Sequence, residues 1–191
     1  MDMSCFFCSS LKTSLKKECF FQWPPTWMGP VTVTEVPKLS DDIKYYFTRA
    51  TGDLDIQLIK VIDSSRVTLD IAIYTLTKQT VTDAIIKARN RGVKVRIIAD
   101  NEMAQTTWVI KQLDNLKELR IPIKENVHKG RMHLKIIIAD NKIVTTGSYN
   151  YTKAATYDND ELLLIITNSG IATDFTKEFN AMWASPKYIA Y

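Results

Sequence analysis

The sequence predicts an α/β layered domain with a mixed β-sheet. Apolar residues alternate with a period of two in some segments and recur at helical spacing in others, and the two kinds of segment follow one another along the chain. Strands that alternate with helices are typical of layered α/β proteins. Two β-branched runs joined by Asp140-Asn141 add an antiparallel hairpin, because two such residues between strands favour a tight turn. The sheet is therefore expected to contain both parallel and antiparallel pairs.

Composition limits the class of protein without defining it. The chain has 191 residues and a formal net charge of +4, which suits one domain with a full core. This mild positive charge is compatible with nucleic acid or anionic lipid as partner and requires neither. No apolar run approaches the roughly 18 residues that span a bilayer, and the N-terminus does not resemble a signal peptide. We therefore expect a cytoplasmic protein.

Residues 1–30 differ from the rest and are predicted to be a leader of uncertain structure. Cys5, Cys8 and Cys19 suggest zinc, but the first histidine is His128, so a fourth ligand is missing. We favour a docked or poorly ordered leader over a zinc site. Three cysteines also argue against a closed set of disulfides. The catalytic domain is expected to cover residues 31–191.

Regular periodicity begins at Val31 and allows each element to be placed in order. A strand over 31–36 is expected to lead into a charged loop, and a strand over 67–73 is expected to bury one face. The short strand over 121–127 contains a proline, so it is expected at an edge or at a strand start. Strands are predicted at 31–36, 67–73, 93–100, 121–127, 134–139, 142–147 and 162–167, and helices at 54–64, 81–88, 104–116 and 171–183.

Candidate functional residues concentrate in residues 133–161. His133 and Lys135 share one face of a predicted strand, because side chains alternate along a strand. Ser148 and Asn150 share a face after the returning strand of the hairpin. An imidazole, an ammonium group, a hydroxyl and a carboxamide can therefore converge on one anion. We interpret this cluster as a phosphate site that contains a nucleophile.

These residues resemble a known motif. The pattern His133-x-Lys135-x4-Asp140, followed by Gly147-Ser148-x-Asn150 and Glu161, is similar to the HKD motif of the phospholipase D superfamily. The flanking segments agree, so the resemblance covers about residues 31–185. It implies a layered α-β-α domain. A single motif copy looks like the short nuclease branch, related to the mitochondrial cardiolipin hydrolases, in which a homodimer completes the active site.

The resemblance also implies roles for the motif residues. His133 would form a covalent phosphohistidine, and Lys135 would neutralise the phosphate. Ser148 and Asn150 would donate hydrogen bonds to the phosphate oxygens. The superfamily generally works without metal or other cofactor, and no carboxylate cluster in the sequence suggests a two-metal site.

Two acidic residues need separate treatment. Asp140 belongs to the catalytic motif, but it lies at the hairpin turn and on the opposite parity from His133. We therefore expect it to hold the turn and the network that positions the motif. Glu161 is the better candidate to accept the His133 imidazole proton and fix its tautomer, whereas Asp160 should face away.

Basic residues surround the motif and could follow a polyanionic backbone. For this set we prefer nucleic-acid binding to a merely solvated surface: Lys124, Lys129, Arg131 and Lys153. The function expected is a metal-independent, non-specific endonuclease acting on DNA or RNA. The alternatives are a phospholipase acting on a lipid such as cardiolipin and an inactive nucleic-acid-binding scaffold.

Overall fold

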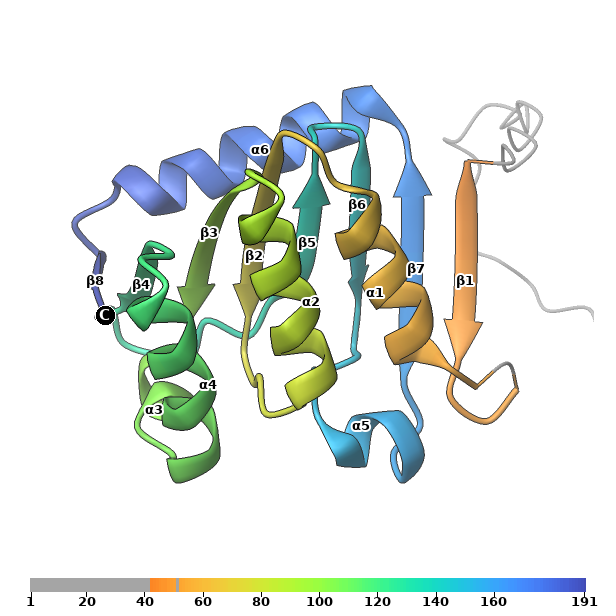
Figure 1. The fold of residues 1–191 in the computed structure, drawn as a ribbon, viewed down its shortest axis with the longest axis horizontal. Coiled ribbons are helices and arrows are strands. Elements are labelled where there is room, and N and C mark those ends of the chain that lie inside the picture. The colour runs from red at the N-terminus through yellow and green to blue at the C-terminus, as the bar shows by residue number, and fades with distance from the viewer. Residues whose placement is uncertain (1–41, 51) are drawn as a thin grey trace, which may run out of the picture. The chain divides into compact units, whose positions relative to one another are not determined.

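One mixed β-sheet organises the part of the chain that the structure describes. A computed structural model describes residues 42–50 and 52–191. Within these residues eight strands pair in the order β1-β7-β6-β5-β2-β3-β4-β8 (Figure 1). The strands are β1 (Ile43–Phe47), β2 (Thr68–Ile73), β3 (Lys94–Ala99), β4 (Ile123–Asn126), β5 (Lys135–Ala139), β6 (Ile143–Gly147), β7 (Leu162–Thr167) and β8 (Tyr188–Ala190). Only β2-β3 and β3-β4 are parallel pairs, so the predicted mixed sheet is confirmed.

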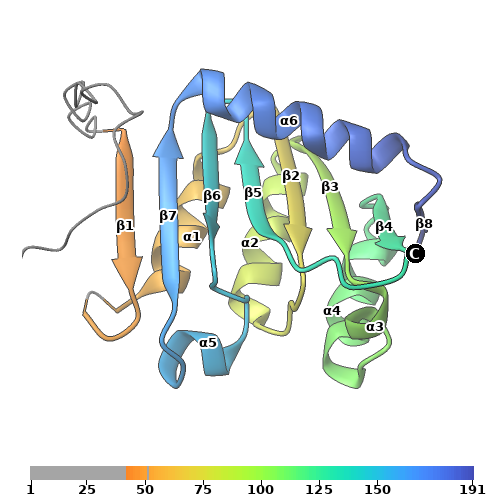
Figure 2. The same cartoon turned by 180° about the vertical axis from the view of Figure 1, so that it is seen from behind.

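Helices cover the sheet on both sides and give the predicted α-β-α layering. Helices α1 (Leu54–Ser64), α2 (Gln79–Asn90) and α4 (Thr107–Glu118) lie on one face, and α6 (Ser169–Ala184) crosses the other (Figures 1 and 2). Two short helices, α3 (Asn101–Ala104) and α5 (Lys153–Tyr157), lie in the loops. Each face has its own apolar cluster, with α1, α2 and α4 packed on one and α6 on the other. The fold class is therefore the expected one.

Strand β2 is buried on both faces, which corrects the expectation of one buried face. Ile71 packs in the cluster under α1 and α2, while Ala72 packs in the cluster under α6. Asp70 also points to the α6 side, where it is 4% exposed and accepts two hydrogen bonds of 2.8 Å from Arg96. A central strand of an α/β sheet is covered by helices on each side, so both of its faces lose water.

The strand over 31–36 and the start of the predicted catalytic domain at residue 31 lie outside the described residues. Strand β1 occupies part of the segment expected to be a charged loop. Its Lys44 and Tyr45 side chains are exposed, so the segment lacks the apolar alternation that reveals a half-buried strand. The strand over 121–127 is not at the sheet edge, because β8 pairs with β4, but its proline is at the strand start as the other alternative predicted: Pro122 comes directly before β4. The helix over 104–116 is divided into α3 and α4, and neither α5 nor β8 was expected.

The β5-β6 hairpin turns at the predicted residues, but its loop has three residues instead of the expected two. Asp140 and Asn141 have φ values of 53° and 52°, the left-handed pair of a tight turn, and the Lys142 N–H donates to the Ala139 carbonyl at 3.0 Å. Ala139 pairs with Ile143, so Lys142 is an additional residue between the two strands. Gly147 ends β6 with a φ of 139°, and a Cβ atom there would lie 2.1 Å from the carbonyl oxygen of Leu162. Only glycine allows β6 and β7 to approach so closely at this point.

Loops that begin at the carboxyl ends of the parallel strands β2 and β3 meet the start of β5 at one edge of the sheet (Figure 1). In open α/β sheets this edge is the usual place for a ligand site. In the described part of the chain no helix is both long and apolar enough to cross a membrane.

Candidate active site

His133 and Lys135 lie together at this edge of the sheet. Lys135 is the first residue of β5 and is 6% exposed, whereas the preceding His133 side chain is exposed. The Lys135 Nζ donates a 2.7 Å hydrogen bond to the His133 carbonyl and lies 3.0 Å from His133 Nδ1. The predicted convergence of imidazole and ammonium group is therefore present. Because Lys135 is buried, little water competes for the hydrogen bonds of its Nζ.

Tyr74 packs against the histidine and was not identified from the sequence. Its ring centroid lies 4.4 Å from that of His133, and its backbone N–H donates to the carbonyl of Leu134 at 2.9 Å. Lys135 Nζ and the Arg131 guanidinium lie 5.0 and 5.9 Å from the Tyr74 ring centre, within cation–π range. The available signal was its place at the carboxyl end of the alternating segment 67–74.

The local charges favour a neutral imidazole. The ring is largely exposed, but partial desolvation lowers the pKa of His133, and the positive charges of Lys135 and Arg131 lower it further, while Asp100 acts in the opposite direction. Burial also lowers the pKa of Lys135, and the negative charge of Glu161 partly opposes that change. A histidine that is neutral near pH 7 can act as a nucleophile.

Asp100 fixes the loop that carries His133. Like Tyr74, Asp100 was not identified from the sequence as part of the site. Its buried carboxylate accepts 2.8 Å and 3.1 Å hydrogen bonds from the backbone N–H groups of Met132 and Met103. It therefore caps α3 and holds the residue before His133 at the same time.

Ser148 and Asn150 follow β6 and alternate with buried residues, as predicted. Tyr149 and Tyr151 are 1% exposed, while Ser148 is exposed and Asn150 is partly exposed. The Asn150 Oδ1 is buried without a hydrogen-bond partner among the described residues. Because an amide oxygen only accepts hydrogen bonds, the predicted contact of Asn150 with a phosphate would come from its Nδ2 group.

Glu161 has a different partner from the one expected. Its Oε2 accepts a 2.5 Å hydrogen bond from the Ser148 hydroxyl, and its Oε1 accepts one of 3.2 Å from Asn159. No hydrogen bond joins it to His133 in the described part of the chain, where Lys135 occupies Nδ1 instead. The expected contact of Glu161 with the imidazole is therefore replaced by a contact with Ser148. Because a serine hydroxyl has one proton, Ser148 must release Glu161 before it can donate to a phosphate.

Asp140 lies at the other end of β5 from the histidine. Its carboxylate accepts hydrogen bonds from the backbone N–H groups of Arg66, Val67 and Thr68 at 2.9, 2.7 and 2.9 Å. Burial alone would raise the pKa of Asp140, but these three bonds outweigh it and lower that pKa. The geometry agrees with a role in holding the turn and separates Asp140 from the site chemistry.

The four basic residues differ in their surroundings. Lys124 is tied to α6 and β8, since its Nζ donates to the carbonyls of Trp183 and Tyr188 at 2.7 and 3.3 Å. These bonds argue against the predicted contact of Lys124 with nucleic acid, because its ammonium group already has partners. Arg131 lies 3.7 Å from Glu102 at the surface, and Lys129 and Lys153 are exposed.

Residues 42–50 and 52–191 contain no group of three histidine, cysteine or acidic side chains placed to hold a metal ion. The leader cysteines considered for zinc lie outside these residues.

A sheet edge that presents an exposed histidine next to a buried lysine places the chain in a class of α/β proteins built to bind and attack a phosphate group. A family model described as "Cardiolipin synthase, PLD-like domain" matches residues 58–183, about two thirds of the chain. The chain therefore belongs to this phospholipase D-like family, and the predicted class, a hydrolase of the phospholipase D superfamily, is confirmed.

Individual relatives agree with this assignment. The chain is 28% identical over 127 residues to the mitochondrial cardiolipin hydrolase of Chlamydomonas reinhardtii, covering 66% of this chain and 56% of that protein. The structure of Nuc from Salmonella typhimurium, a phospholipase D family member, matches with a TM-score of 0.73 and 27% identity, covering 78% of this chain and 97% of Nuc. NucT from Helicobacter pylori matches with a TM-score of 0.64 and 28% identity, covering 78% and 99%. These matches confirm the predicted resemblance to the single-motif branch. The chain spans about half the length of the cardiolipin hydrolase relatives that it matches first.

Proposed function

We propose that this chain is a metal-independent endonuclease that hydrolyses phosphodiester bonds in DNA or RNA through a phosphohistidine on His133. The observation that carries the proposal is the pairing of an exposed imidazole with a buried ammonium group 3.0 Å away. A phosphate that approaches His133 meets the Lys135 charge where little water screens it, so the attraction is strong.

The reaction proceeds in two displacements. Substrate phosphate draws the Lys135 ammonium away from Nδ1, because an anion is a better partner for it than a neutral nitrogen. The imidazole can then carry its proton on Nδ1 and attack phosphorus with the Nε2 lone pair. The P–N bond forms as the P–O bond to the leaving group breaks. Water next attacks phosphorus, the P–N bond breaks, and the imidazole is regenerated.

A second copy of the chain supplies the acid and base. The leaving oxygen takes a proton from the imidazolium of the second copy's His133, and that imidazole later takes a proton from the attacking water. The exposure of His133 supports this arrangement, because a two-fold axis beside it would bring the two imidazoles face to face.

Nucleic acid is the preferred substrate because of the charges around the site. Lys129, Arg131 and Lys153 are exposed on the segments that carry or flank the motif, and they can contact successive phosphates. Likeness to Nuc and NucT over nearly their full lengths supports the same choice.

One observation favours a lipid as the second candidate substrate. An apolar groove of about 320 Å³ between β5 and α6 is lined by Leu134, Ile136, Phe175 and Met182 among others. Its lining includes Leu134, the residue after His133, and several relatives are named mitochondrial cardiolipin hydrolase. However, carboxylates of α6 also line the groove, and they would repel an anionic bilayer.

The test compares the wild type with His133→Ala and His128→Ala in EDTA. His128 is the only other histidine of the chain, and its Nδ1 contacts the Lys129 carbonyl outside the site, so it is a matched control. Substrates are single-stranded and duplex DNA, single-stranded RNA and cardiolipin vesicles. We expect the wild type and His128→Ala to cut nucleic acid, and His133→Ala to bind it without cutting.

Each other outcome has a defined meaning. Hydrolysis of cardiolipin alone would replace the nuclease by the lipid enzyme, and binding without cleavage by any form would indicate a scaffold. Loss of activity in EDTA would refute the metal-independent mechanism. Specific activity that falls on dilution is expected for a shared active site, whereas constant activity at nanomolar protein would refute the shared site.

A further inference from the structure

Thr48 lies directly after β1 and is joined to Glu161, a residue 113 positions away in the sequence. The Thr48 N–H donates to the Glu161 carbonyl at 3.1 Å, and the Glu161 N–H donates to Thr48 Oγ1 at 3.1 Å. The Thr48 hydroxyl also approaches the Glu161 carbonyl at 3.4 Å. Both backbone polar groups of Glu161 are therefore satisfied by this one threonine.

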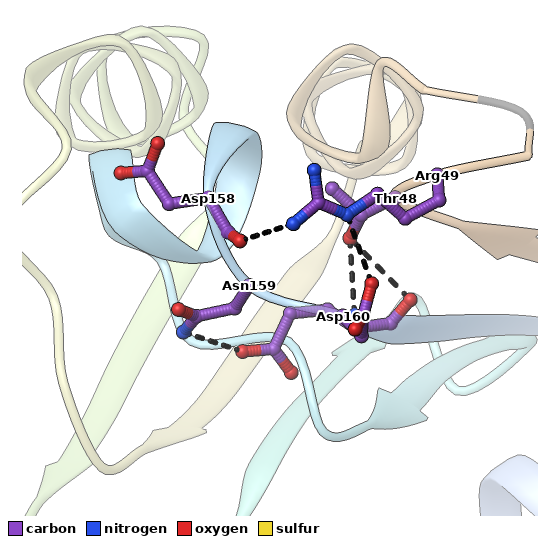
Figure 3. A network of polar contacts seen from close by, with 6 residues as sticks. Thr48, Arg49, Asp158, Asn159 and Asp160 are labelled. Atoms are coloured by element: carbon purple, nitrogen blue, oxygen red, sulfur yellow. Dashed lines mark hydrogen bonds and ion pairs between the residues drawn. The ribbon is translucent and has the colours of Figure 1, made fainter.

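Arg49 holds the residues that precede Glu161. Its Nε donates to the Asp160 carboxylate at 2.9 Å and its terminal nitrogen donates to the Asp158 carbonyl at 2.7 Å, as the dashed lines in Figure 3 show. The side chains of Arg49 and Asp160 are 65% and 84% exposed, so their ion pair contributes little by itself. The hydrogen bonds through Thr48 are less exposed, because Thr48 and Glu161 are both partly buried.

The connection continues from Glu161 to the phosphate side of the site. Glu161 accepts the Ser148 proton at 2.5 Å, and the Ser148 oxygen accepts from the Leu162 N–H at 3.1 Å. The position of the hydroxyl thus depends on where the start of β7 lies. A hollow of about 280 Å³ lined by Arg49, Ser148 and Glu161, among others, opens beside these groups.

The geometry points to Thr48 as a positioning residue for the active site: it fixes Glu161 so that the carboxylate orients the Ser148 hydroxyl and balances the Lys135 charge. This inference rests on the proposed function. The inference deepens the proposed function, because Thr48 lies far from the motif residues in the sequence. A hydroxyl is needed, since only a group that accepts a hydrogen bond can satisfy the Glu161 N–H.

The test uses Thr48→Val, Thr48→Ser and a matched control. Valine keeps the shape of threonine and removes the hydrogen bonds of the hydroxyl, while serine keeps them. Thr176→Val is the control, because the Thr176 hydroxyl makes a comparable 2.8 Å hydrogen bond to Asn141 near the distant hairpin turn. Cleavage rates as a function of substrate and pH are measured together with amide hydrogen exchange at Glu161 and Leu162.

Thr48→Val is expected to lower kcat about five- to tenfold with little change in KM, the effect of losing one such hydrogen bond. A less well held Glu161 supports the Lys135 charge less, so the pKa of Lys135 is expected to fall, which an NMR titration of the lysine side chain measures. Thr48→Ser and Thr176→Val should behave as the wild type does. Exchange should accelerate at Glu161 and Leu162 in Thr48→Val alone.

The inference is overturned if Thr48→Val cuts as fast as the wild type, if Thr48→Ser is equally slow, or if Thr176→Val loses as much activity. If the wild type cuts none of the substrates, the proposed function fails. The exchange rates then decide the positioning role: faster exchange in Thr48→Val supports it, and unchanged exchange overturns it.

Discussion

Asp140→Asn separates the structural from the chemical part of the motif. The carboxylate accepts three backbone hydrogen bonds, two through Oδ1 and one through Oδ2 from Arg66. Asparagine can keep the two bonds to its oxygen as weaker neutral ones, but its amide then meets the Arg66 N–H donor to donor. Bonds to charged acceptors contribute about 1.5–3 kcal/mol and neutral ones about 1 kcal/mol. For a partly exposed group, a loss of about 2 kcal/mol in the free energy of unfolding is expected.

The effect on stability should be large and the effect on chemistry small. For a domain of this size, about 2 kcal/mol lowers Tm by about 4–8 °C. Seven residues of extended strand separate Asp140 from His133 by roughly 20 Å. The folded Asp140→Asn protein should therefore cut substrate at a rate within about twofold of the wild-type rate.

Thermal and urea unfolding followed by circular dichroism measure the stability, and initial cleavage rates at 20 °C measure the activity. Asp174→Asn is the control, since Asp174 is a 75% exposed carboxylate that pairs with Lys177 at the surface. A variant with unchanged Tm and a tenfold lower rate would refute the reasoning, because Asp140 would then act in the chemistry.

The stability difference between the wild type and Asp140→Asn should depend on pH. Because the pKa of Asp140 is lower in the folded chain than its ordinary value of 3.8, the stabilisation is complete above pH 3.8 and is lost as the pH falls through the folded pKa. The stability difference between wild type and Asp140→Asn should therefore be constant near neutral pH. It should shrink in strong acid, where the wild-type carboxyl is protonated.

Three further changes have defined outcomes. Arg131→Gln removes a positive charge that lowers the pKa of His133, so the acidic limb of the pH–rate profile should move to higher pH; an unchanged limb would show that the charge does not reach the imidazole. Gly147→Ala places a Cβ 2.1 Å from the Leu162 carbonyl at a φ of 139° and should lower the free energy of unfolding by about 2–4 kcal/mol, measured by urea unfolding. Lys124→Ala should leave oligonucleotide affinity at 50 mM salt unchanged while lowering Tm, because its ammonium group is already bonded to carbonyls at the end of α6; a weaker complex would restore its predicted contact with nucleic acid.

Local signals in the sequence were sufficient to place the hairpin turn and to predict which residues after β6 are exposed. Asp140 and Asn141 adopt the left-handed conformations that such a turn requires, and the alternation that buries Tyr149 leaves Ser148 exposed. Helix α1 and strand β7 begin and end where periodicity placed them, since each has a full apolar pattern with clear breaks.

Partners distant in the sequence could not be predicted in the same way. Tyr74 meets His133 only because β2 pairs with β5, and pairing order is not written in the local pattern of either strand. Glu161 was assigned to the histidine by analogy with other histidine sites, whereas the tight approach of β6 and β7 at Gly147 brings it to Ser148. Strand β1 was not predicted because it has exposed residues on both faces and therefore lacks the alternation of a half-buried strand.

Strand β1 pairs with β7 through five residue pairs, from Ile43 with Ile166 to Phe47 with Leu162, and then turns directly into Thr48. Without it, β7 would present the unpaired backbone of an apolar run to solvent, which is a template for the addition of strands from other molecules. Removal of residues 42–50 should therefore cause aggregation as well as release Glu161. Screens that shorten the chain from its beginning would report an insoluble protein and would miss the contribution of Thr48 altogether, so only point substitutions can reveal it.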